Sequence, residues 1–180
     1  TGANAQVKGC VFRNNYAFNY GGAIYNTGGN TSVSECFFEG NSSYSAPGIY
    51  AGYSGVITVI NSVFSGNASS GGSGAISVGT NVSLANCTFY GNTNTSSSGG
   101  AAIEVYGGNL IAKNCIFSNN TENGASQDYN QVRSNWGATT IQNCLFDTLD
   151  NYAYNNNVAG DPLFTDAAGS DFSLQAGSPA

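Results

Sequence analysis

Acidic side chains that could act in pairs gather toward the end of the chain. Half of the ten acidic residues lie there: Asp147, Asp150, Asp161, Asp166 and Asp171. A glycoside hydrolase needs two carboxylates at a set separation, and this group could supply such a pair. Aspartate is also common in turns, and we favour this solvated role for all five. The sequence has no histidine, which excludes a serine or cysteine nucleophile activated by histidine.

Basic side chains are few and dispersed, at Lys8, Arg13, Lys113 and Arg133. A polysaccharide lyase would need a basic residue beside its substrate and usually a cluster of carboxylates for calcium, and neither pattern is visible. The net charge of −6 argues against a nucleic-acid partner, which requires a basic surface. The sequence contains no Cys-x-x-Cys pair of the kind that binds zinc. No apolar run approaches the roughly 20 residues of a membrane helix. We therefore expect no catalytic residues, no metal, no cofactor and no membrane span in this chain.

The cysteines recur at a nearly constant interval. Five cysteines and one serine each stand two residues before a phenylalanine, at steps of 25 to 29 residues: Cys10, Cys36, Ser62, Cys87, Cys115 and Cys144. A fixed period of this size indicates a solenoid, in which each repeat stacks on its neighbours. Such a column can be a stack of small buried side chains or a ladder of disulfides. We expect free thiols, because parallel Cβ vectors do not face each other as a disulfide requires.

The composition favours strands over helices in these repeats. Glycine, asparagine, serine and threonine are abundant, and they suit turns and strands better than helices. Each repeat can hold about three short strands with their turns. We predict an all-β fold, a parallel β-helix (β-solenoid) of about six coils with three short strands per coil. Residues 1–149 would form the coils and residues 150–180 a closing tail of the same domain.

Two columns of small polar residues predict how each coil turns. The residue before each Cys or Ser is glycine or asparagine in five of six repeats, and both tolerate left-handed backbone. We predict a one-residue bend there, which turns both the Cys or Ser and the following Phe inward. Asparagine recurs three residues after the Phe, and stacked asparagines can form a hydrogen-bonded ladder: Asn15, Asn41, Asn67, Asn92 and Asn120.

Aromatic residues next to an inward isoleucine column form a candidate binding surface. Tyr25, Tyr50, Ser77 and Glu104 each follow an isoleucine of that column, so by alternation they should point outward. Tyr53 and Tyr106 could extend an aromatic strip that, together with Glu104, suits sugar binding. The alternative, which we favour, is aromatic packing between neighbouring strands that stabilises the sheet.

A second outward column is apolar. The residues between each inward Cys or Ser and its Phe are apolar in five of six repeats. An exposed apolar stripe of this length is usually an interface or is covered. The tail after Asp150 could fold back over it, or it could contact another subunit. The apolar members of the stripe are Val11, Phe37, Val63, Ile116 and Leu145.

Two phrases alternate along the chain, Phe-x-x-Asn and a phrase that reads Gly21-Gly22-Ala23-Ile24 in its full form. They resemble the repeats of polymorphic outer membrane proteins and, more broadly, right-handed parallel β-helix surface proteins of the pectin-lyase-like superfamily. The segment from Asp161-Pro162 to the last residue is similar to the closing segment of bacterial surface β-helix proteins. The fifth repeat departs from the pattern, because residues 121–140 lack the glycine phrase and carry Trp136, so we expect a loop there.

The resemblance implies a right-handed β-helix outside the cell, but it spans adhesins, lyases and hydrolases alike. We expect a non-catalytic, extracellular rod of a bacterial surface or secreted protein, acting in adhesion or as a spacer. Its partners would be surface glycans or further copies of itself, in lateral or end-to-end contact. The alternatives are a subunit of a filament that stacks through the open ends of the solenoid, and a carbohydrate-active enzyme.

Overall fold

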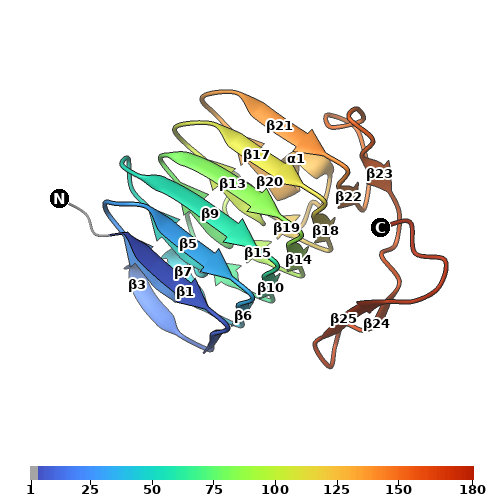
Figure 1. Ribbon diagram of the computed structural model, residues 1–180, viewed down its shortest axis with the longest axis horizontal. Coiled ribbons are helices and arrows are strands. Elements are labelled where there is room, and N and C mark those ends of the chain that lie inside the picture. The colour runs from blue at the N-terminus through green and yellow to red at the C-terminus, as the bar shows by residue number, and fades with distance from the viewer. Residues whose placement is uncertain (1–3) are drawn as a thin grey trace.

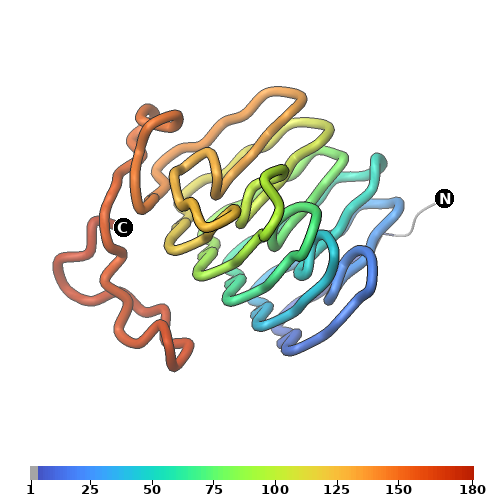
Figure 2. The backbone as a smooth tube through the Cα atoms, turned by 180° about the vertical axis from the view of Figure 1, so that it is seen from behind, coloured from blue at the N-terminus to red at the C-terminus, as the bar shows by residue number. Residues whose placement is uncertain are grey.

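The computed structural model describes residues 4–180 and shows a stack of β-coils with a tail at its side, seen from the front in Figure 1 and from behind in Figure 2. Four parallel sheets run the length of the stack, named here sheets A to D in chain order. Five coils contribute to all four sheets, and a sixth coil contributes to sheets A and B. The predicted fold class, an all-β parallel β-helix, is confirmed.

Each sheet gathers one strand from successive coils. Sheet A contains β1 (Ala5–Lys8), β5 (Thr31–Ser34), β9 (Val56–Ile60), β13 (Asn81–Ala85), β17 (Leu110–Lys113) and β21 (Thr139–Gln142). Sheet B contains β2 (Val11–Arg13), β6 (Phe37–Glu39), β10 (Val63–Ser65), β14 (Thr88–Tyr90), β18 (Ile116–Ser118), β22 (Leu145–Phe146) and β23 (Val158–Ala159). Sheet C contains β3 (Tyr16–Tyr20), β7 (Ser42–Ser45), β11 (Ala68–Ser69), β15 (Thr93–Asn94) and β19 (Thr121–Glu122).

Sheet D contains β4 (Ile24–Asn26), β8 (Ile49–Ala51), β12 (Ile76–Val78), β16 (Ile103–Val105) and β20 (Val132–Ser134). The strands expected around the Cys-x-Phe and Ala-Ile phrases are present, and the short strands of sheet C are an additional element after the asparagine column. The fifth coil carries the short helix α1 (Asp128–Gln131) where a loop was expected. An antiparallel hairpin in the tail joins β24 (Phe164–Asp166) to β25 (Asp171–Leu174).

The predicted one-residue bend lies between sheets A and B. All six residues of this column have left-handed backbone, with φ between 49° and 62°: Gly9, Glu35, Asn61, Asn86, Asn114 and Asn143. Because the bend resets the in-and-out alternation, both the Cys or Ser and the Phe of each coil face the core. A second left-handed column, which the sequence analysis missed, separates sheets B and C at Asn14, Gly40, Gly66, Gly91 and Asn119.

The core is built from stacked columns of identical residues. Six phenylalanine rings stack face to face with centroids 4.5 to 5.1 Å apart: Phe12, Phe38, Phe64, Phe89, Phe117 and Phe146. The five cysteines are free thiols, as predicted, and all but Cys10 are buried. Ser62 replaces a thiol in the column, where its hydroxyl accepts the N–H of Cys36 at 3.1 Å.

The asparagine column forms the predicted ladder. Each side-chain amide donates to the Oδ1 atom of the next asparagine at 2.7 to 2.9 Å, from Asn15 through to Asn120. The amides of Asn41, Asn67, Asn92 and Asn120 also donate to a phenylalanine carbonyl one coil back, as Asn67 does to Phe38 at 3.0 Å. At the end of the ladder, Gln131 of α1 accepts the Asn120 amide at 2.9 Å. The insertion in the fifth coil therefore terminates the ladder with a satisfied partner.

The start of the tail covers the last coil by continuing two core columns. Tyr152 stacks on Phe146 with ring centroids 5.8 Å apart, and its hydroxyl donates to the carbonyl of Val132. Asn157 takes the next place in the cysteine column, because its Oδ1 accepts the N–H of Cys144 at 2.8 Å. Strand β23 then extends sheet B by pairing with β22.

The apolar stripe of sheet B is largely covered by the tail, which was one of the two predicted alternatives, so it is not the exposed interface that the other alternative described. Leu145 is buried, while Phe37, Val63 and Ile116 are half-buried and only Val11 is well exposed. The hairpin β24–β25 explains this difference, because the Phe172 ring packs beside Phe37 and Tyr90. A hydrogen bond of 2.8 Å from the Ser170 hydroxyl to Glu39 fixes the tip of the hairpin against the second coil.

A buried carboxylate joins the fifth-coil insertion to the tail. Asp128 accepts hydrogen bonds from the backbone N–H groups of Asp150, Asn151 and Tyr152 at 2.8 to 2.9 Å, and from that of Tyr129 at 2.7 Å. Burial opposes its charge, but these donors outweigh burial and lower the pKa of Asp128 below its ordinary value of 3.8.

We expect Asp128→Asn to lower the free energy of unfolding by about 2 to 3 kcal/mol at pH 7, because one amide oxygen cannot accept all these bonds. Since the folded pKa is depressed, the charged form stabilises the fold above pH 3.8, and this contribution is lost as the pH falls through the lower folded pKa. Urea unfolding of both proteins at pH 7 and at about pH 3 measures this difference.

Asp147→Asn is the matched control. Burial raises the pKa of Asp147, so its charge costs stability and neutralising it should change the free energy of unfolding little or favourably. Equal destabilisation by both substitutions, or no change for Asp128→Asn, would contradict the assigned role of Asp128.

Candidate binding surface

Five tyrosines form a continuous cluster, called here the tyrosine cluster, beside sheet D. Tyr25 and Tyr50 occupy the same register position on β4 and β8, and their rings stack 5.2 Å apart at 9°. Tyr20, at the end of β3, packs on Tyr50 at 4.8 Å. Tyr53 meets Tyr106 edge to face at 5.3 Å. The structure thus brings together all four tyrosines selected from the sequence and adds Tyr20.

Tyr106 reaches across a whole coil to join the cluster. Its hydroxyl lies 2.9 Å from the Tyr50 hydroxyl and 3.2 Å from the carbonyl oxygen of Ala51. The ring passes over Gly79, where a Cβ atom would come within 2.6 Å of it. Burial, together with the contact to Tyr50, raises the pKa of Tyr106 above its ordinary value. The third coil therefore contributes a glycine to the cluster where neighbouring coils contribute rings.

We expect Gly79→Ala to displace the Tyr106 ring and to return its pKa toward the ordinary value of 10.0. Absorbance titration of tyrosinate between about pH 9 and 12 should then count one more tyrosine ionising with the exposed ones. Gly52→Ala is the matched control, because a Cβ there meets its nearest atom at an ordinary 3.6 Å. Identical titration curves for Gly79→Ala and the parent would contradict this placement of the ring.

Glu104 lies at the edge of the cluster and is held by its neighbours. Its carboxylate accepts hydrogen bonds from the hydroxyls of Ser73 and Ser77 and, at 3.3 Å, from the Asn135 amide. Ser77 shares the outward register position of Tyr50 and Glu104, as predicted, but it is buried. The reason is that Glu104 and its hydrogen bond cover the small serine.

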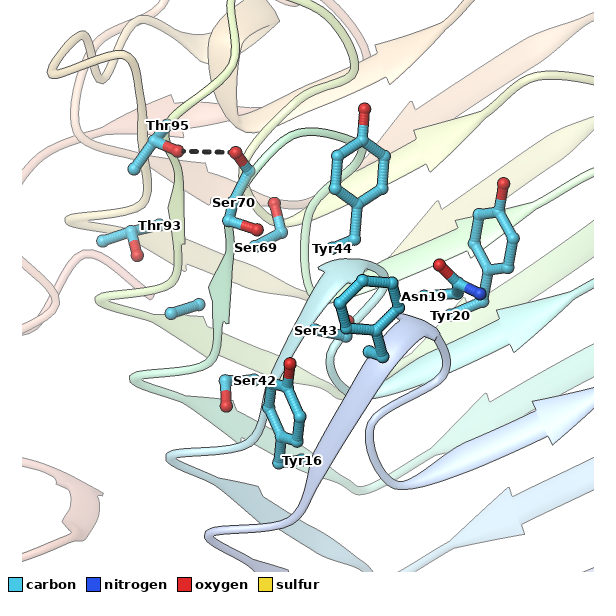
Figure 3. A pocket seen from close by; sticks show the side chains of 12 residues that line it. Tyr16, Asn19, Tyr20, Ser42, Ser43, Tyr44, Ser69, Ser70, Thr93 and Thr95 are labelled. Carbon is cyan, nitrogen blue, oxygen red and sulfur yellow. Dashed lines mark hydrogen bonds between the residues drawn. The ribbon is translucent and has the colours of Figure 1, made fainter.

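A groove over sheet C adjoins the cluster and was missed by the sequence analysis. It has a volume of about 590 Å³ and is lined by Tyr16, Phe18, Tyr20, Tyr44 and small polar residues of the first four coils (Figure 3). Tyr20 belongs to both the groove and the cluster. The signal was present, because Tyr16 and Phe18 alternate along β3 and so share a face, whereas Tyr20 follows a register irregularity in that strand.

Residues 1–161 match the family model described as the right handed beta helix region. The chain belongs to this family. The match covers the whole coiled part and the first residues of the tail, in agreement with the parallel sheets. Comparisons with curated proteins and with solved structures found no match. Family membership assigns this right-handed β-helix its fold and leaves its activity to be argued from the surface.

Two of the five aspartates near the end of the chain line one pocket of the β-helix. Asp147 and Asp161 line a space of about 270 Å³ between the last coil and the tail, with Ser118, Asn119 and Gly160. Burial raises the pKa of Asp147, and the nearby charge of Asp161 adds to this shift. Asp161 is exposed, and its Oδ1 accepts the N–H of Leu163 at 2.8 Å, as turn aspartates do.

Among residues 4–180, three of the four lysine and arginine side chains form ion pairs and Lys113 does not. Lys8 pairs with Glu35, Arg13 with Glu39, and Arg133 with the buried Glu122. Residues 4–180 contain no group of three histidine, cysteine or acidic side chains placed to hold a metal ion. Within the same range, no helix is long and apolar enough to span a membrane.

Proposed function

We propose that the chain is a non-catalytic, extracellular rod of a bacterial surface or secreted protein that binds its partner through an exposed aromatic face. The observation that carries this proposal is the continuous surface formed by the groove and the tyrosine cluster. Tyr16, Phe18 and Tyr53 are each more than 70% exposed. A hydrophobic patch of this kind on a soluble fold is usually a binding site. Low charge and the family resemblance support export.

The experiment combines binding with turnover. The purified protein is applied to a broad panel of glycans and to bacterial and host surface extracts, and the release of new reducing ends or unsaturated products is followed in parallel. Retention of a partner without any product supports a binding rod. Product formation would overturn the non-catalytic proposal, and the absence of any bound partner would leave only a spacer role.

The pocket of Asp147 and Asp161 supports a second candidate, a glycoside hydrolase. A half-buried carboxyl group whose pKa is raised, beside a second carboxyl group, is the kind of pair that a glycoside hydrolase uses. This candidate ranks second, because Asp147 already accepts the Asn119 N–H and the Gln131 amide. Turnover that disappears in both Asp147→Asn and Asp161→Asn would establish it.

A filament that grows by stacking of coil ends is less well supported. Tyr152, Asn157 and β23 cover the last coil and use the groups that a following subunit would need. Electron microscopy over a concentration series tests this alternative, since short isolated rods at every concentration would exclude it.

A further inference from the structure

The rings of Tyr16, Phe18 and Tyr44 in the sheet C groove differ from those in the tyrosine cluster because they do not stack on other rings. Tyr16 is 71% exposed, Phe18 79% and Tyr44 50%. Among residues 4–180, none of these three rings packs against another aromatic ring, whereas the cluster tyrosines stack on one another. Figure 3 shows Tyr16, Tyr20 and Tyr44 standing out from the sheet along one side of the groove. Their faces remain available to a ligand.

The floor of the groove carries hydroxyl groups. The register position of Tyr16 continues as Ser42, Ala68 and Thr93 on the next three coils. Ser70 and Thr95 lie beside this row, linked by the hydrogen bond drawn in Figure 3. The groove therefore runs along the axis of the rod, with rings on the first two coils and small polar residues beyond. Four coils at about 4.8 Å per step give a length of roughly 14 Å.

The groove carries no charge. All twelve residues that line it are aromatic, hydroxyl-bearing, amide or alanine residues, without an acid or a base. A charged ligand would lose hydration there without gaining an ion pair. A neutral ligand with apolar C–H faces can lie against the rings while its hydroxyls meet the serine and threonine floor, as in sites where few polar groups fix orientation.

The position of the Tyr44 ring depends on a glycine beneath it. It lies over Gly71, where a Cβ atom would overlap the ring. A side chain at residue 71 would therefore move the ring out of its place. A ring that is held before binding costs less entropy to immobilise when a ligand arrives.

We propose that the sheet C groove binds an uncharged glycan chain lying along the rod axis, with Phe18 and Tyr44 as its stacking platforms. This inference rests on the proposed binding function and assigns it a ligand class and a location. The tyrosine cluster then acts mainly as packing between coils.

The test is calorimetric titration with neutral hexasaccharides of glucose, mannose and xylose, and with acidic hexasaccharides of galacturonic acid. Phe18→Ala and Tyr44→Ala should each weaken binding of the best neutral ligand by about tenfold. Trp136→Ala is the matched control, since Trp136 is an exposed aromatic residue outside both the groove lining and the tyrosine cluster, and it should change affinity less than about twofold. Tyr25→Ala and Tyr53→Ala test the tyrosine cluster as the alternative location of the site. Unchanged thermal unfolding of the groove variants shows that the fold is retained.

Each other outcome decides against the inference in a distinct way. Loss of binding in the Tyr25 and Tyr53 variants alone would place the site on the cluster and would leave the proposed function intact. Tighter binding of the acidic hexasaccharide would overturn the assignment of a neutral ligand. Binding of none of these probes would overturn the glycan inference, while the binding proposal would still be decided by the surface extracts. Cleavage of a bound probe would overturn both the glycan-binding inference and the proposal of a non-catalytic rod.

Discussion

Asn67→Ala is expected to lower the free energy of unfolding by about 4 kcal/mol, because it breaks the asparagine ladder in its middle. Asn67 is fully buried. Its Oδ1 accepts both the backbone N–H and the side-chain amide of Asn41, at 3.0 and 2.9 Å. Its own amide donates to the carbonyl of Phe38. Truncation leaves these three buried groups unpaired, at about 1 to 3 kcal/mol each.

Asn61→Gly in the same coil is the control for Asn67→Ala. Asn61 is exposed and has left-handed backbone with φ 49°, a conformation that glycine adopts freely. We expect a change below about 1 kcal/mol for this variant. Urea unfolding followed by circular dichroism measures both values. If Asn67→Ala lowered the free energy of unfolding no more than Asn61→Gly does, the asparagine ladder would not be a principal source of stability.

Phe89→Ala should lower the free energy of unfolding by about 3 to 5 kcal/mol. The ring is fully buried and stacks between Phe64 and Phe117, with centroids 4.9 and 5.1 Å away. The neighbouring coils are held in place by the sheet hydrogen bonds that join β14 to β10 and β18, so they cannot move together to fill the space left by the removed ring. A cavity therefore remains, and its cost adds to the lost burial.

Phe18→Ala supplies the comparison for the phenylalanine stack. Phe18 is 79% exposed, so its truncation should change the free energy of unfolding by less than about 0.5 kcal/mol. The loss in free energy of unfolding caused by Phe89→Leu should lie between those of Phe89→Ala and Phe18→Ala, because leucine fills part of the space left by the ring. Similar melting temperatures for the Phe89 and Phe18 alanine variants would show that the stack does not carry the core.

The columns of the β-helix were predictable because each one is read directly from a repeated phrase. Three features stood at a constant offset from the Cys-x-Phe phrase: the bend at Asn86 and its equivalents, the free thiols, and the ladder through Asn67. Stacking then converts a constant offset into contact. Tyr25 and Tyr50 stack as predicted, since alternation along a strand fixes the face on which a side chain lies. Tyr53 and Tyr106 lie just beyond β8 and β16 and join this stack.

Features that occur only once along the chain were not predictable in this way. Gln131 at the end of the ladder, and Tyr152 and Asn157 over the last coil, replace column residues with residues of another type. The hairpin over the apolar stripe was left as one of two alternatives, because sequence alone does not show where a tail of this length returns. The aromatic groove was missed because only the first two coils carry rings there.

The most direct test of the binding account is nuclear magnetic resonance of the protein, with its aromatic rings isotopically labelled, during titration with the best-bound neutral hexasaccharide. The account predicts that the ring signals of Tyr16, Phe18 and Tyr44 shift together in proportion to ligand bound, while the sugar stays intact. Ring signals that remain unchanged, with backbone shifts gathered around Asp147 and Asp161 and new reducing ends in solution, would contradict it.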